Sequence, residues 1–205
     1  MAPEERFVPR FAAEPAQEGL PYGRWADTLR EHFLAACLPI ADDVGEAGEL
    51  RFFPDRTWWG RTYVPITARS STGLDLYGYV AFAPGHEGAE PADFESHADW
   101  TEETAEANPE WRMDLCEEVV GGWRGEGGRT AAMTLVWGVP LVAGGAIVTA
   151  ELAQLTVDQC PLLEDRFTLV APDAYRGDTI EVALFDRNGS ELARESLYED
   201  EDDSA

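Results

Sequence analysis

One acidic segment of the chain holds most of the side chains that can bind a metal ion. Imidazole and carboxylate groups are common metal ligands. The segment contains His86, Glu87, Glu90, Asp93, Glu95, His97 and Asp99. Their spacings match no metal-binding motif, and carboxylates cluster by chance in a chain with 40 acidic residues. We therefore interpret the segment as a solvated acidic loop, and we predict no metal site and no cofactor.

Several enzyme classes lack their essential residues in this chain. The sequence contains no GxSxG, HExxH or DxDxDG pattern, so the signatures of serine hydrolases, zinc proteases and calcium loops are missing. All 15 basic residues are arginine, which excludes Schiff-base chemistry and the lysine-dependent phosphate sites of kinases and P-loop enzymes. The enzymatic alternative is a hydrolase or metal-dependent enzyme that uses carboxylates or histidines of the 86–118 segment.

A group of aromatic and arginine side chains is the strongest candidate for a binding surface. It comprises Trp58, Trp59, Arg61, Tyr63, Arg69, Tyr77 and Tyr79. The last five alternate with apolar residues along two predicted strands, so they share the outer face of one hairpin. Exposed aromatic residues and arginine are enriched in interfaces. We predict that this face binds a protein or small-molecule ligand; the alternative is that a helix or another sheet covers it.

The net charge restricts the possible partners. Forty acidic residues against 15 basic ones give a net charge of −25. Nucleic acids and anionic lipid surfaces attract basic proteins, so we expect neither as a partner. The lysine-free composition is consistent with codon bias in a GC-rich prokaryotic genome. Three widely separated cysteines and an N-terminus without an apolar segment predict a cytoplasmic protein with reduced thiols.

The clearest strand signal is a hairpin formed by residues 61–69 and 74–82. In both runs apolar residues alternate with polar ones. The register that sets apolar against apolar pairs residue 68 with 76, 66 with 78 and 64 with 80. This register leaves a loop that ends at Gly73, where a left-handed residue is needed. It also sets Arg69 opposite Asp75 on the outer face.

One amphipathic helix is predicted over residues 24–38. Trp25, Leu29, Phe33 and Cys37 recur at intervals of four and form one apolar stripe, and Pro39 ends the helix. We expect this helix to cover a sheet. Residues 1–22 contain four prolines and are predicted to form an extended arm, whereas residues 41–50 are predicted to be a polar connection.

The uncharged run 131–150 has the length of a membrane-spanning helix. It is interrupted by Pro140 and by two adjacent glycines, and it is rich in β-branched residues. These features favour two buried strands, 130–138 and 146–157, meeting at a turn. A single membrane span over 131–150 is the alternative.

The rest of the chain contains short apolar runs separated by turn residues. We predict a partly ordered, solvated acidic insert over 84–109; a helix over 93–107 is the alternative. Residues 110–118 fit a strand or a helix, and the irregular glycine-rich turn that follows favours the strand. Further strands are predicted near 167–170, 179–185 and 192–198, before an acidic tail at 199–205.

Together these patterns predict one mainly β domain over residues 23–198. We expect antiparallel, sandwich-like sheets with one N-terminal amphipathic helix packed on them, although α+β is possible. The absence of a catalytic motif favours a non-catalytic binding module over an enzyme. The sequence does not identify the ligand, the partner or the oligomeric state.

Overall fold

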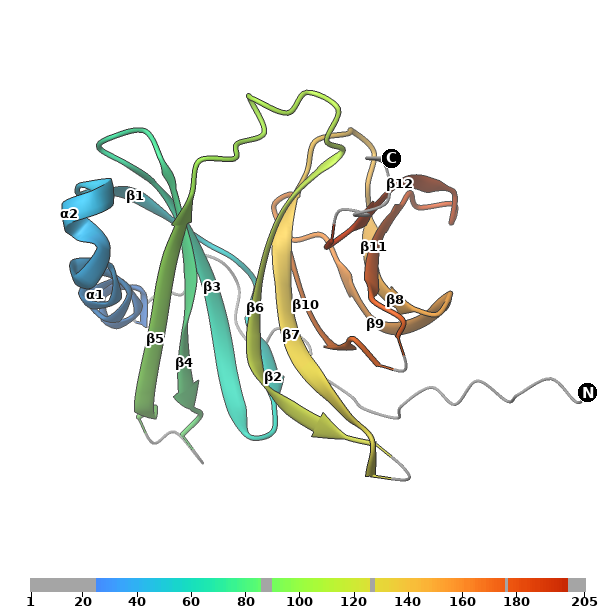
Figure 1. Ribbon diagram of the computed structural model, residues 1–205, viewed down its shortest axis with the longest axis horizontal. Helices are drawn as coiled ribbons and strands as arrows, with labels where there is room; N and C mark the ends of the chain where they lie inside the picture. Colours follow the sequence, from blue (N-terminus) through green and yellow to red (C-terminus); the bar gives the residue numbers. More distant parts are fainter. Residues whose placement is uncertain (1–24, 86–89, 126–127, 176, 199–205) are drawn as a thin grey trace, which may run out of the picture.

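A computed structural model describes residues 25–85, 90–125, 128–175 and 177–198. These residues form three mainly antiparallel sheets, and one helical segment packs on the first sheet (Figure 1). The predicted fold class is therefore confirmed. The predicted arm (1–22) and acidic tail (199–205) lie outside the described residues.

The first sheet, sheet A, contains the predicted hairpin. Its strands are β1 (Ala47–Phe52), β2 (Arg56–Trp58), β3 (Arg61–Ser70), β4 (Asp75–Ala83) and β5 (Ala92–Thr101). β3 and β4 pair in the predicted register, with Ala68 opposite Leu76 and Val64 opposite Val80. Gly73 has a φ of 89°, the left-handed conformation that the loop requires.

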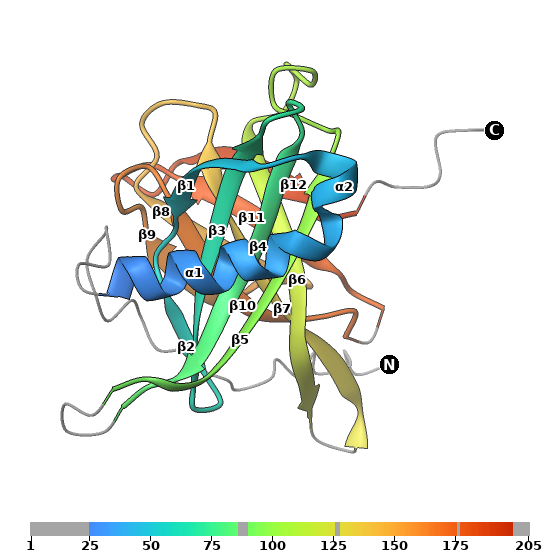
Figure 2. The same ribbon diagram turned by 90° about the vertical axis from the view of Figure 1, so that its left-hand side faces the viewer.

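The helical segment covers one face of sheet A. It consists of α1 (Ala26–Cys37), η2 (Leu38–Ile40) and α2 (Ala41–Val44). Figure 2 shows α1 lying across the strands of sheet A. Leu29, Phe33 and Cys37, from the predicted stripe, are buried against apolar residues of the sheet. The prediction of a polar connection over 41–50 is wrong, because Val44 and Leu50 are buried and anchor α2 and β1 to the same core.

Two further sheets complete the structure. Sheet B has the order β10-β7-β6, with β6 (Met113–Arg124), β7 (Thr130–Pro140) and β10 (Phe167–Asp173). Sheet C has the order β12-β11-β8-β9, with β8 (Ile147–Leu152), β9 (Leu155–Pro161), β11 (Ile180–Phe185) and β12 (Glu191–Ser196). The strands predicted near 167–170, 179–185 and 192–198 are therefore present.

The uncharged run 131–150 forms strands, as predicted. Among the described residues, no helix has the length and apolar character needed to cross a membrane. The two strands do not pair with each other, however, because β7 belongs to sheet B and β8 to sheet C. β8 is also shorter than predicted, since Ala153 and Gln154 adopt positive φ and turn the chain into β9.

Four layers follow one another across the molecule: the helical segment, sheet A, sheet B and sheet C (Figure 1). A separate apolar cluster fills each of the three spaces between the layers. Sheets A and B are consequently covered on both faces. This double coverage explains why β3 is buried along most of its length.

Two predictions for the acidic and glycine-rich segments are wrong. Ala92–Thr101 form β5, a full strand paired with β4, where we predicted a partly ordered insert. Phe94, Ala98 and Trp100 pack against the helix–sheet core, but their alternation is concealed by the many acidic residues between them. The predicted glycine-rich turn begins later than expected, because β6 continues to Arg124.

A buried ion pair connects the three sheets. Arg56 on β2 of sheet A contacts Asp158 on β9 of sheet C, and both side chains are more than nine-tenths buried. The second carboxylate oxygen of Asp158 accepts a 2.9 Å hydrogen bond from the backbone N–H of Val170 on β10 of sheet B. One carboxylate thus has partners in both other sheets.

We predict that Asp158→Ala lowers the free energy of unfolding by about 3–5 kcal/mol, because it leaves a buried guanidinium without its counter-ion. Asp75→Ala, which breaks the partly exposed ion pair between Asp75 and Arg69, should cost less than about 1 kcal/mol. Urea denaturation of both variants measures the difference. Equal costs would show that the buried pair does not hold the sheets together.

Candidate functional site

The predicted aromatic binding face is largely covered by sheet B. Tyr63 is 5% exposed, and Trp58, Tyr77 and Tyr79 are partly buried in the same cluster between sheets A and B. The Tyr63 and Tyr79 rings meet edge to face at 5.8 Å. The alternative that another sheet covers this face therefore describes these residues better than a fully exposed surface does.

Trp59 lies in a sharp turn, with its ring centroid 6.2 Å from that of Trp58. Trp58 pairs with Arg61, so Trp59 and Gly60 form a two-residue loop in which both have positive φ. The Trp59 side chain is 87% exposed. Arg61 turns toward β5, where its guanidinium lies 3.2 Å from a carboxylate oxygen of Glu95. Four of the seven predicted residues thus lie in the cluster between sheets A and B, namely Trp58, Tyr63, Tyr77 and Tyr79. Trp59 is exposed beside them, and Arg61 and Arg69 form ion pairs.

We expect Tyr63→Ala to cost about 3 kcal/mol of unfolding free energy, because truncating a buried aromatic side chain leaves a cavity. Trp59→Ala should cost less than about 1 kcal/mol, since exposed side chains contribute little to stability. Guanidinium denaturation of the two variants provides the comparison. A small cost for Tyr63→Ala would mean that sheet B does not cover this face.

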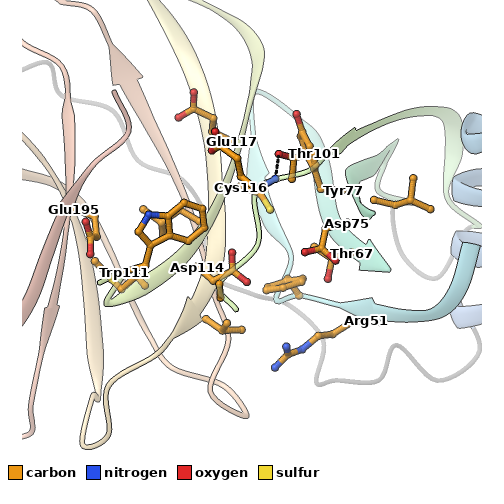
Figure 3. Close-up of a pocket in the computed structure, with 18 of the residues that line it drawn as sticks. Arg51, Thr67, Asp75, Tyr77, Thr101, Trp111, Asp114, Cys116, Glu117 and Glu195 are labelled. Atoms are coloured by element: carbon orange, nitrogen blue, oxygen red, sulfur yellow. Dashed lines mark hydrogen bonds between the residues drawn. The ribbon is translucent and has the colours of Figure 1, made fainter. Parts of the chain in front are cut away.

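A large cleft opens at the end of the space between sheets A and B. Its volume is about 1190 Å³. Figure 3 shows Arg51, Asp75 and Tyr77 on the sheet A side, Trp111 and Glu195 on the opposite side, and Asp114 between them. The cleft extends around the first half of β6, because this strand forms one edge of sheet B. Arg69 and Tyr77, two of the predicted binding residues, line it.

Acidic side chains dominate the lining of the cleft. Eight are carboxylates: Glu49, Asp75, Glu103, Glu106, Glu110, Asp114, Glu117 and Glu195. Only two lining residues, Arg51 and Arg69, are basic. Arg69 is already engaged, with one guanidinium nitrogen 2.7 Å from Asp75 and 3.7 Å from Glu106. The cleft therefore carries a strong excess of negative charge.

The half-buried carboxyl groups of the cleft bind protons more tightly than solvated ones. Burial raises the pKa of Asp114, and the nearby Asp75 raises it further, while Arg51 opposes the shift. Burial, followed by repulsion from Asp173 and Glu118, raises the pKa of Glu117 from 4.5 to about 7. Each shift means that the charged form is destabilised at this position.

Glu117 lies on the opposite face of β6 from Cys116 and Glu118. Cys116 packs in the cluster between sheets A and B, whereas the electrostatic neighbours of Glu117 include Asp173 on β10 and Tyr198 after β12. Asp173 is 2% exposed; it accepts hydrogen bonds from the Tyr198 hydroxyl and, at 3.0 Å, from the backbone N–H of Ile180. Among the described residues, Glu117 Oε2 has no hydrogen-bond partner.

The raised pKa of Glu117 predicts a pH-dependent cost in stability. Below its ordinary pKa the group is neutral in both the folded and unfolded states, so it adds no penalty. As the pH rises through the window from 4.5 to about 7, only the unfolded state ionises freely, and folding loses stability.

Glu117→Gln should therefore increase the free energy of unfolding more at pH 8 than at pH 4. We expect a difference of about 1–2 kcal/mol, a value reduced for solvent screening because the side chain is partly exposed. Denaturation at both pH values measures this difference. The exposed Glu103→Gln in the same cleft is the control. A Glu117→Gln effect that is independent of pH would contradict the assignment.

A histidine–carboxylate cluster lies beside the floor of the cleft. His97 Nε2 on β5 is 2.8 Å from Glu118 Oε1 on β6, so this contact joins sheet A to sheet B. Donor atoms of His97, Asp99 and Glu118 all lie within 4.8 Å of one another, and no second group of this kind occurs among the described residues. The His97 ring also lies 6.0 Å from that of Tyr79.

The cluster contains two of the possible metal ligands identified in the acidic segment. His97 and Asp99 are brought together on β5, whereas Asp93 and Glu95 lie near Arg61 instead. His86 and Glu87 lie outside the described residues. Glu118 was not singled out as a ligand, because no sequence pattern connects it to β5.

No family model, curated protein or solved structure matches the chain.

Proposed function

We propose that the protein is a non-catalytic binding module and that its cleft between sheets A and B binds a basic peptide segment of a partner protein. The excess of carboxylates over arginines in the lining supports this proposal most directly. A cationic side chain in the cleft would be attracted by this charge and would relieve the repulsion among the half-buried carboxylates.

The size and shape of the cleft favour a peptide over a small molecule. A volume of about 1190 Å³ exceeds the ~300–1,000 Å³ typical of small-molecule pockets. The lining also follows the first part of the edge strand β6, from Met113 to Glu117, which suits an extended chain. Its negative charge selects segments rich in arginine or lysine.

Aromatic side chains add a second source of affinity. Trp111, Tyr77 and Tyr198 line the cleft among the carboxylates, and aromatic faces attract arginine and lysine through cation–π contacts. Tyr77 and Arg69 belong to the binding residues predicted from the sequence. The proposal therefore keeps the predicted binding function but relocates its centre from the outer hairpin face to the cleft.

The chemistry of the cleft favours binding over nucleophilic catalysis. Burial raises the pKa of the Cys116 thiol, as do the surrounding carboxylates, so the reactive thiolate is disfavoured. The chain has no lysine to act as a nucleophile. The carboxylates remain as ligands for cations.

Isothermal titration calorimetry of the full chain with a short arginine-rich peptide tests the proposal. Asp114→Asn/Glu117→Gln should weaken binding about tenfold, equivalent to ~1.4 kcal/mol, because it removes two half-buried charges from the lining. Affinity should also fall as ionic strength rises, since the interaction is largely electrostatic. A chelator in all buffers excludes effects of metal ions.

The matched control is Asp42→Asn/Asp43→Asn, which removes the same net charge from exposed residues of α2, on the far side of sheet A. This variant should bind the peptide as the original chain does. Equal loss in both variants would show that net charge, and not the cleft, attracts the peptide. Tight binding of spermine in preference to the peptide would replace the peptide assignment with a polyamine.

A further inference from the structure

We propose that His97, Asp99 and Glu118 form a binding site for a divalent transition-metal ion at the edge where β5 of sheet A faces β6 of sheet B. The site lies beside the cleft and does not depend on the proposed peptide function. It uses one imidazole nitrogen and two carboxylates.

The geometry of β5 brings two of the ligands to one face. Alternate residues of a strand point to the same side, so His97 and Asp99 are neighbours on the face that looks toward sheet B. Their partners across the ladder on β4 are Tyr79 and Tyr77. The two tyrosines pack between the sheets and form the wall behind the cluster.

The third ligand comes from a different sheet. Glu118 projects from β6 toward β5, and its Oε1 lies 2.8 Å from His97 Nε2. Adjacent ligands of a metal with bonds of about 2.1 Å lie about 3 Å apart in an octahedral arrangement. The observed separation therefore matches one edge of a coordination shell.

The remaining adjustment is small. All three donor atoms lie within 4.8 Å of one another, while opposite ligands of an octahedral ion are about 4.2 Å apart. Closing this difference requires rotation of the Asp99 side chain, whose Oδ1 accepts a 2.8 Å hydrogen bond from the backbone N–H of Trp100.

Electrostatics favour a cation at this position. Among the described residues, no arginine forms an ion pair with Asp99 or Glu118. The guanidinium of Arg61, which also lies beside β5, is engaged by Glu95. With His97 neutral, as a ligand must be, the cluster has two negative charges, which a divalent ion neutralises.

The donor set indicates the class of metal. An imidazole ligand favours zinc, cobalt or nickel over calcium and magnesium, which prefer oxygen ligands alone. The His97 and Glu118 side chains are 44% and 21% exposed, so water molecules can complete the coordination shell. The ion would connect the free edges of sheets A and B.

Titration of the chelator-treated full chain with Zn²⁺ and Co²⁺ tests the site. We expect one equivalent to bind with a dependence on His97, and Co²⁺ to give the visible absorption bands of a protein-bound ion. Saturating Zn²⁺ should raise the melting temperature, because an ion that binds only the folded state stabilises it. Mg²⁺ should produce neither effect.

Two variants and one control identify the ligands. His97→Gln and Glu118→Gln should each weaken Zn²⁺ binding at least tenfold and abolish the thermal shift. Glu95→Gln changes the same face of β5 next to His97 and should leave both unchanged. Far-ultraviolet circular dichroism of the metal-free variants confirms folding.

The proposal is overturned if Zn²⁺ binds without loss in both ligand variants, or if no stoichiometric binding occurs. It is also overturned if Glu95→Gln loses as much affinity as the ligand variants. Peptide binding, measured with chelator present, is unaffected by any of these outcomes, so failure of the metal site leaves the proposed function standing.

Discussion

The buried contact between Arg56 and Asp158 constrains how the three sheets can be arranged. A guanidinium and a carboxylate removed from water must remain paired, since either charge alone is costly in the interior. Arg56 projects from the short strand β2, and Asp158 is also held by the backbone of β10. The pair therefore fixes sheet A against the other two sheets at one side of the layers.

At the side of the layers opposite the Arg56–Asp158 pair, the edges of sheets A and B also meet. The β5 and β6 edges of sheets A and B come together where Glu118 reaches His97. Between the two sides, Trp137, Tyr63 and neighbouring residues fill the space with apolar contacts. At the end of the sheets this packing stops, and the cleft opens between strand ends that carry charged residues. The cleft and the His97 cluster are thus consequences of the same layering.

Local chemistry made much of the fold predictable. The hairpin of β3 and β4 could be predicted to the exact residue pair, because alternation, loop length and Gly73 all require one register. The helix followed from its apolar stripe. These features depend only on residues near one another in the chain, where periodicity is informative.

Sequence patterns were less informative where contacts between distant segments determine the burial and pairing of a strand. Tyrosine is both apolar and polar, so the sequence left open whether Tyr63 and Tyr79 are exposed or covered by another sheet; sheet B covers them. The apolar alternation in β5 was masked by the acidic residues of the strand, which lie on the opposite face from Phe94, Ala98 and Trp100. Strand pairing partners are not encoded by periodicity, which is why β7 and β8 were placed together although they belong to different sheets.

The candidate sites were harder to predict because their residues come from distant segments. The cleft combines Arg51, Asp114 and Glu195, which lie on three different parts of the chain. The His-x-Asp pattern of residues 97 and 99 was visible, but the strand that aligns them was not predicted. Only the fold brings Glu118 to the same point.

The distribution of carboxylates suggests why the structure tolerates charge at partly buried positions. Burial raises the pKa values of Asp114, Glu117 and Glu118, so each ionised group makes folding less favourable at neutral pH. A neutral amide at these positions would avoid that cost. Carboxylates held in this state gain most from a cation, because a ligand supplies the counter-charge that the protein lacks. This holds for a basic side chain in the cleft and for a metal ion beside it.

The two cations would also repel each other, so occupation of one site should weaken the other.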